Sequence, residues 1–270
     1  MPIPSRWRLL DHDTDTVVAE CDDIDGLFTD RVFPVPPVYE RYTLLGCTPE
    51  GPLRAAVDGT GPAWLGNIYL EGVHAPCSAT ADCLTCYETG EQLLDVRVVG
   101  HTEAAGGLLD VELDARIGAP LAANERPLYD MWRAGGPTAP NQWAGLERSD
   151  RYLWVQAARA HQVHAPDKPA GTVYHLDGRH VTDYDAFYCA IGEAINGPGG
   201  WFGGDLFWLH ECAGTGDAGA TPGFRLIWHD AEIARTHLVP GYDRKAWSVA
   251  VTFDDLVDRL TDDGVQVELR

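Results

Sequence analysis

The segment that most constrains the fold runs from Gly197 to Ala213 and reads GPGGWFGGDLFWLHECA. Pro198 fixes its backbone φ angle, and the surrounding glycines lose much conformational entropy when ordered, so the start of this segment is not helical. Asp205 occupies a favourable N-cap position, and the residues after it suit a helix. We therefore predict a glycine-framed aromatic loop that leads into a helix at about Asp205–Ala213. Rings, glycines and acids combined on one loop are typical of a binding site, or of a turn whose rings fill the core.

The charge of the chain limits its partners. It has 20 Lys and Arg against 41 Asp and Glu, a formal net charge of −21. This charge opposes direct binding to nucleic acid or to an anionic membrane, and it favours a basic partner or simply high solubility. No basic-then-apolar signal region opens the sequence and no run approaches 18 apolar residues, so we expect a cytosolic protein. The seven unevenly spread cysteines do not indicate a secreted disulfide framework.

The length of 270 residues predicts about two domains. Residues 1–165 show short apolar runs separated by Pro, Gly and Asp, which predicts a mainly β domain, either a sandwich or barrel-like. Residues 125–149 look irregular, like a long surface loop or a segment packed on the sheet. The predicted strands are Trp7–Leu10, Val17–Cys21, Arg41–Gly46, Ala63–Leu70, Leu93–Val99, Leu108–Leu113 and Tyr152–Ala157.

One cluster in the first half has the residue types of a metal site. His74 and Cys77 are followed by Cys83 and Cys86, which gives H-x2-C and C-x2-C with five residues between them. Zn²⁺ prefers four Cys or His ligands in a tetrahedron, so a structural zinc is one interpretation, with Cys47 as a substitute for His74. The other interpretation is reduced thiols in a polar loop, because structural sites usually space their ligand pairs more widely. No other cofactor is expected.

The second domain is predicted at residues 171–270, after a linker of proline, charge and glycine at 165–171. Strands and helices alternate in this region, which predicts a small three-stranded parallel sheet with helices against it. The predicted strands are 172–176, 224–229 and 265–269, and the predicted helices are 183–195, 205–213, 231–238 and 253–263.

This second domain resembles barstar, the family of intracellular inhibitors of barnase-type ribonucleases. The resemblance covers under 40% of the chain and includes the order of elements, the opening Leu176-Asp177-Gly178, and the spacing from Trp201-Phe202-Gly203 to Glu211-Cys212. It implies a three-stranded parallel sheet with helices, and a loop and helix that insert into the active site of a ribonuclease. In that family an acid on the exposed helix face takes the place of the substrate phosphate, and the corresponding acid is Glu211. The residues that the resemblance and the helix periodicity place at the partner surface are Trp201, Phe202, Gly203, Asp205, Phe207, Trp208, His210 and Glu211.

The helix departs from the family pattern at several positions. Phe207 stands where the family usually has an additional acid, and His210 stands where barstar has tryptophan. The acid of the last helix corresponds to Arg259, with Asp258 and Asp262 nearby. Glu211 replaces an aspartate, which lengthens the side chain by one methylene. The face is therefore less acidic and more aromatic than that of barstar, which predicts a target other than barnase itself.

The function that this resemblance implies is a non-enzymatic inhibitor that blocks a basic ribonuclease or a similar toxin. The first domain would then extend the interface, dock a second partner or stabilise the protein. An alternative is a regulatory interaction module of barstar shape with no nuclease target. A third is an enzyme whose site lies in the first half. The sequence has no G-x-S-x-G, P-loop or H-E-x-x-H motif, which argues against this third interpretation.

Overall fold

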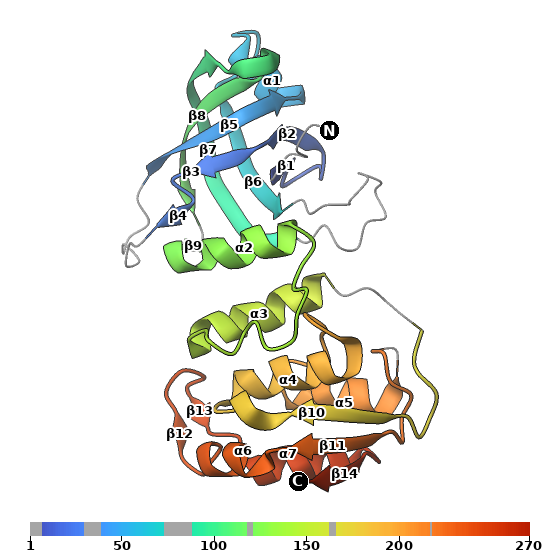
Figure 1. Ribbon diagram of the computed structural model, residues 1–270. Helices are drawn as coiled ribbons and strands as arrows, with labels where there is room; N and C mark the ends of the chain where they lie inside the picture. The colour runs from blue at the N-terminus through green and yellow to red at the C-terminus, as the bar shows by residue number, and fades with distance from the viewer. Residues whose placement is uncertain (1–6, 30–38, 73–87, 118–120, 162–165, 217) are drawn as a thin grey trace. The chain divides into compact units, whose positions relative to one another are not determined.

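The computed structural model describes residues 7–29, 39–72, 88–117, 121–161, 166–216 and 218–270 (Figure 1). The chain divides into two compact units, Met1–Gly135 and Gly136–Arg270. Each unit is described by itself below. Residues 136–161, which the sequence pattern assigned to the first domain, lie with the second unit.

The N-terminal unit is a closed β-barrel. Six strands follow one another in the order β2-β1-β6-β7-β8-β5 with antiparallel neighbours, and pairing of β2 with β5 closes the ring. The short β3 extends the sheet beside β5, and β4 pairs with β9. The strands are β1 (Trp7–Asp11), β2 (Val17–Cys21), β3 (Asp23–Asp25), β4 (Phe28–Thr29), β5 (Glu40–Pro49), β6 (Trp64–Gly72), β7 (Glu88–Glu103), β8 (Leu109–Ile117) and β9 (Leu121–Ala122).

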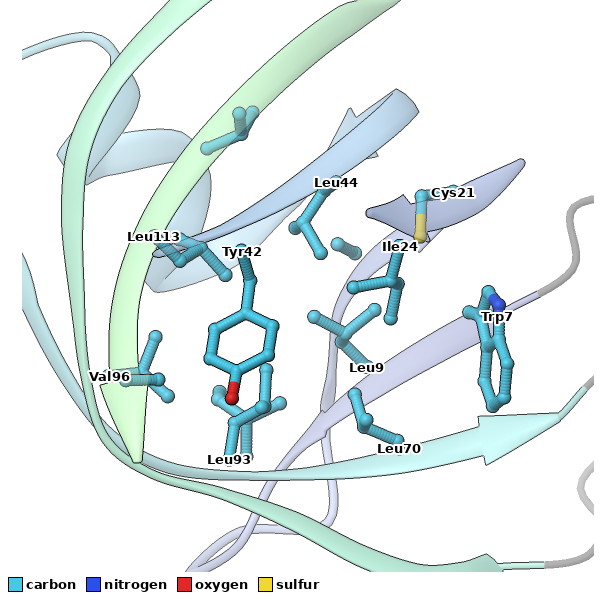
Figure 2. Packing of buried hydrophobic residues seen from close by; sticks show 14 of the residues in the cluster. Trp7, Leu9, Cys21, Ile24, Tyr42, Leu44, Leu70, Leu93, Val96 and Leu113 are labelled. Atoms are coloured by element: carbon cyan, nitrogen blue, oxygen red, sulfur yellow. The ribbon is translucent and has the colours of Figure 1, made fainter. Parts of the chain in front are cut away.

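Alternation of apolar and polar residues fills the interior of the barrel. Along β8 the buried side chains are Val111, Leu113 and Ala115, and the intervening residues are acidic or basic. Figure 2 shows the rings of Trp7 and Tyr42 among aliphatic side chains from several strands. The period of two therefore decides which face is buried, as expected for a sheet with one face against a core. The prediction of a β-rich N-terminal domain is confirmed, and of the two predicted architectures it takes the barrel.

Three helical segments of the chain differ from the sequence prediction. A short helix, α1 (Gly51–Val57), follows β5, and α2 (Arg126–Arg133) lies within the region expected to be irregular. The predicted strand Tyr152–Ala157 is wrong, because these residues belong to α3 (Arg148–Ala160). Its buried Trp154, Val155 and Ala158 follow a helical period, and a short apolar run alone does not distinguish a helix from a strand.

The C-terminal unit contains the predicted parallel sheet, in the strand order β10-β11-β14. Helix α4 lies between the sheet and α3, which explains why it is buried on nearly all sides (Figure 1). Asp183 caps α4, and its carboxylate accepts a hydrogen bond from the Ala186 N–H. The elements are β10 (Val173–Asp177), α4 (Tyr184–Asn196), α5 (Leu206–Thr215), β11 (Arg225–His229), α6 (Ala231–His237), β12 (Tyr242–Asp243), β13 (Ser248–Val249), α7 (Phe253–Asp262) and β14 (Gln266–Leu269), with 3-10 turns at Ala105–Gly107, Ala123–Glu125 and Gly178–His180.

Candidate functional site

The loop between α4 and α5 is held in one shape by close backbone packing. The Asn196 side chain donates hydrogen bonds to the carbonyl oxygens of Trp201 and Ala218, at 2.7 and 2.8 Å. Gly203 has a φ of +86°, and a Cβ added there would lie 3.0 Å from the backbone nitrogen of Leu209. Only glycine accepts this conformation without strain while α5 approaches so closely. The loop is therefore a rigid support for the first turn of α5.

The three loop residues expected to contact a partner lie inside the domain. Trp201 is 7% exposed, Phe202 is fully buried, and Gly203 is also buried. Phe202 packs edge-on against Phe224 with the ring centroids 5.8 Å apart. These rings fill the core, which is the second of the two roles that the sequence left open for such a loop. Their contribution to a binding surface is to position α5.

Helix α5 begins as the sequence predicts. The Asp205 carboxylate accepts a hydrogen bond from the Trp208 N–H at 2.7 Å, which satisfies one of the free N–H groups at the helix start. One side of the helix is buried through Leu209, Cys212 and Ala213. The opposite side faces solvent and carries the candidate residues described next.

A chain of aromatic rings crosses the first turn of α5. Phe207 is 62% exposed, and its ring meets that of Trp208 edge-on with centroids 5.5 Å apart. Trp208 in turn lies 6.1 Å from Trp201, also edge-on. Phe207 is exposed but packs against the indole of Trp208, which packs in turn against Trp201. A side chain held in this way loses little conformational entropy when a partner binds it. Such rings are frequent anchors of protein interfaces.

His210 is oriented by a buried acid. Its Nδ1 lies 2.6 Å from Oδ1 of Asp263, whose side chain is only 4% exposed. Nη1 of Arg259 lies 3.8 Å from the same oxygen, so this guanidinium helps to neutralise Asp263. The imidazole is therefore held in one orientation by its carboxylate partner.

Glu211 lies partly exposed beside His210, and among the described residues no cation is within salt-bridge distance of its carboxylate. The neighbouring Cys212 is not a nucleophile. Burial, the main cause, and the charge of Glu211 raise the pKa of its thiol to about 12. The arrangement supplies a negative charge, a fixed imidazole and apolar area, which are the components of a binding surface.

The structure thus brings Asp205, Phe207, Trp208, His210 and Glu211 together on one helix at the surface. Sequence reasoning missed Asp263, which fixes His210 from the end of α7. It also missed Arg159 of α3, whose guanidinium lies 4.4 Å from the ring centroid of Trp208. The sequence pattern points to Asp258 and Asp262 in this helix rather than to Asp263, and it assigns the segment with Arg159 to the first domain. Phe207 and His210 are exposed, and Trp208 and Glu211 are partly exposed; we call these four residues the α5 face.

The proposed zinc ligands His74, Cys77, Cys83 and Cys86 lie outside the described residues. Cys47, the suggested substitute for His74, is buried in the barrel, and burial raises the pKa of its thiol to about 12. A buried thiol with a raised pKa is a poor metal ligand, because metals bind the thiolate. Within the described ranges, no three His, Cys, Asp or Glu residues form a group that could hold a metal ion.

Comparison with known proteins supports the C-terminal assignment. Residues 171–270 match the family model of barstar, described as the barnase inhibitor. No curated protein and no solved structure gives a significant match to this chain. None of the helices in the described part of the chain is both long and apolar enough to span a bilayer.

Proposed function

We propose, on the premise that residues 171–270 are a barstar-family domain, that this protein binds and blocks a basic ribonuclease or a similar cationic toxin. The observation that carries the proposal is the position of Phe207 and Glu211. Both lie on the solvent side of α5, whose first turn is supported by a rigid loop. Among the described residues, Glu211 forms no ion pair. A carboxylate presented in this way can enter a cleft that otherwise binds a phosphate.

The net charge of −21 supports the same partner class. Long-range attraction between this chain and a cationic enzyme would accelerate their encounter, and salt would slow it. The cysteines within the described residues, Cys21, Cys47, Cys189 and Cys212, are buried free thiols, as expected in a reducing compartment. We therefore place this inhibition in the cytoplasm.

The target we propose is a ribonuclease other than barnase. Phe207 and Arg259 stand at positions where the resemblance leads us to expect acids, so the α5 face offers one carboxylate, Glu211, beside an exposed ring. A cleft that fits it would place an apolar wall next to its phosphate-binding cations. Such a cleft differs from one that binds an inhibitor through several acidic side chains.

The test is inhibition of a panel of basic bacterial ribonucleases, barnase among them, by the wild-type protein and two variants. We expect Glu211→Ala and Phe207→Ala each to weaken inhibition of the best target by about 30-fold, which corresponds to a hot-spot loss of about 2 kcal/mol. The exposed Glu232 of α6 provides a control, because Glu232→Ala removes one acid outside the α5 face. Unchanged inhibition by both α5 variants would contradict the proposal.

The alternative is a regulatory module of barstar shape that binds a protein other than a nuclease. The aromatic character of the α5 face, with Phe207 and Trp208 side by side, favours a partner with an apolar surface. Capture of the native partner from the host, followed by a ribonuclease assay of the captured protein, separates the two functions. The alternative would be favoured if the captured partner has no ribonuclease activity and is no longer captured by the Phe207→Ala variant.

A further inference from the structure

Helix α3 precedes the residues that match barstar, yet it packs directly on the loop that supports the α5 face (Figure 1). A Cβ added to Gly204 would lie 3.3 Å from Cγ1 of Val155, so the helix touches the loop backbone. The Cys189 thiol lies 3.8 Å from the carbonyl oxygen of Arg151, so α3 also packs against α4. The surface next to α5 is therefore built by an element outside the matched domain.

The last turn of α3 adds a cation to the aromatic chain on α5. The Arg159 guanidinium carbon lies 4.4 Å from the ring centroid of Trp208 and 5.9 Å from that of Trp201. Phe207 contacts the same Trp208 ring edge-on. Arg159 itself is exposed, and Tyr152, two turns earlier on the same side of α3, is 49% exposed. Arg159, Trp208 and Phe207 thus form a continuous surface across the two helices.

The charge of Arg159 is unusual in its setting. Although acids outnumber bases two to one in the chain, no carboxylate among the described residues lies within salt-bridge distance of Arg159. Most described arginines of the same unit do pair with carboxylates, namely Arg148, Arg151, Arg179, Arg225, Arg235, Arg259 and Arg270. Stacking on an indole holds the guanidinium plane while its N–H groups keep their hydrogen-bonding capacity. Such a group is ready to bind a carboxylate supplied from outside.

The charges of Arg159 and Glu211 both act on the Cys212 thiol. Burial, the main cause, and Glu211 raise the pKa of this thiol, whereas the charge of Arg159 lowers it. Helix α3 therefore presents a positive group over the Trp208 ring, and α5 carries a negative group one turn after the exposed Phe207. Paired opposite charges fix the orientation of a partner more strictly than a single charge does.

Resting on the proposed function, we propose that α3 forms a second part of the inhibitory surface. Arg159 binds a carboxylate on the target, next to the cationic cleft that receives Glu211. The target class is accordingly a ribonuclease or toxin whose phosphate-binding cations have an acid close beside them. An acid of that kind would serve as a general base in phosphodiester cleavage.

Charge reversal gives the decisive test, because the two possible roles of Arg159 predict opposite results. If Arg159 only contributes to the overall field, Arg159→Glu makes the inhibitor more acidic and tightens its binding to a cationic ribonuclease. If Arg159 meets a carboxylate, the same variant places like charges together, and we expect inhibition to weaken at least tenfold. Arg244→Glu is the matched control, because Arg244 is exposed on the β12–β13 hairpin and lacks a carboxylate partner within the described part of the unit. It should leave inhibition unchanged or slightly stronger.

A milder variant covers the case in which Arg159→Glu disturbs folding. Arg159→Gln removes the charge and keeps most of the stem over Trp208, so we expect normal thermal unfolding and a loss of about fivefold in inhibition. Inhibition that is unchanged or stronger in a folded Arg159→Glu or Arg159→Gln protein would overturn this inference. Loss in Glu211→Ala without loss in the Arg159 variants would remove the inference and keep the proposed function. Failure of the wild-type protein to inhibit any ribonuclease of the panel would remove both.

Discussion

At the scale of single residues, two glycines allow the loop before α5 to approach α4 closely. A Cβ added to Gly192 of α4 would lie 2.1 Å from the carbonyl oxygen of Gly200. The loop that carries Trp201 can approach α4 only because both positions lack a side chain. This contact sets the depth at which the loop rings enter the core, and with it the position of α5.

Replacing Gly192 should therefore reverse the usual effect of alanine in a helix. Alanine is favoured over glycine by about 1 kcal/mol in a helix interior, but overpacking costs about 1 to 3 kcal/mol. We expect Gly192→Ala to lower the free energy of unfolding by about 2 kcal/mol in urea denaturation. Gly214→Ala on α5 is the control, since its Cβ would meet the His210 ring at 3.8 Å, and it should raise stability slightly. A Gly192→Ala protein as stable as wild type would show that the loop moves away freely.

At the scale of elements, one arginine fastens α3 to the rest of the C-terminal unit. Nε of Arg148 lies 2.7 Å from Oδ2 of Asp185 on α4, and Nη1 lies 2.9 Å from Oδ1 of Asp243 on the β12–β13 hairpin. Hydrogen bonds from Arg148 are the main cause that lowers the pKa of Asp243 to about 2. Burial raises the pKa of Asp185, and Arg148 offsets part of this rise. Arg148 therefore stabilises the charged form of both carboxylates.

Removal of this guanidinium should destabilise the unit in a pH-dependent way. Arg148→Ala leaves two carboxylates with little exposure and no counter-charge from Arg148, so we expect a loss of about 3 kcal/mol at pH 7. The pKa of Asp243 is depressed in the folded state, so its contribution is complete above its ordinary pKa of 3.8 and disappears as pH falls toward 2.

Urea titrations of the wild-type and Arg148→Ala proteins between pH 7 and pH 2 measure this difference. The gap in unfolding free energy should shrink between pH 4 and pH 2. Arg235→Ala is the control, because its carboxylate partners Glu232 and Asp254 are mostly exposed and their pairs with Arg235 lie on the surface. A gap that stays constant down to pH 2 would show that Arg148 acts by packing alone.

The elements also show what sequence could and could not predict. The cap at Asp205 and the capping box of Thr252 with Asp255 are local signals, so α5 and α7 were predicted close to their bounds. Burial of Trp201 and Phe202 depends on the distant Phe224 and on α3, and no local pattern carries that information. The His210–Asp263 pair joins residues 53 positions apart, and for the same reason it was found only in three dimensions.

At the scale of the whole molecule, the compact C-terminal unit is larger than the part that matches barstar. It begins at Gly136, whereas the match begins at residue 171. The difference includes α3, which covers α4 and supplies Arg148 and Arg151. These arginines pair with carboxylates on α4 and at its N-cap. The apolar run that suggested a strand in the first domain is thus a helix of the second unit.

Fragments of the chain test where the folding unit begins. A fragment of residues 136–270 should unfold cooperatively, because it retains α3 over the buried side of α4. A fragment of residues 166–270 exposes that side and leaves Asp183 and Asp185 without their arginines, so we expect it to be less stable by at least about 3 kcal/mol. Circular dichroism during thermal unfolding measures both fragments. Equal stability of the two would show that α3 is an accessory to a domain complete without it.

Closure of the barrel through β2 and β5 has a consequence for recognition by the N-terminal unit. The backbone N–H and C=O groups of the six strands in the ring form hydrogen bonds with neighbouring strands. The short β3 pairs with a further part of β5. An extended peptide that adds itself to a sheet needs a long unpaired edge, which the described ring does not offer. Any molecule that distinguishes this unit from another barrel must therefore do so through its outward-pointing side chains and its turns.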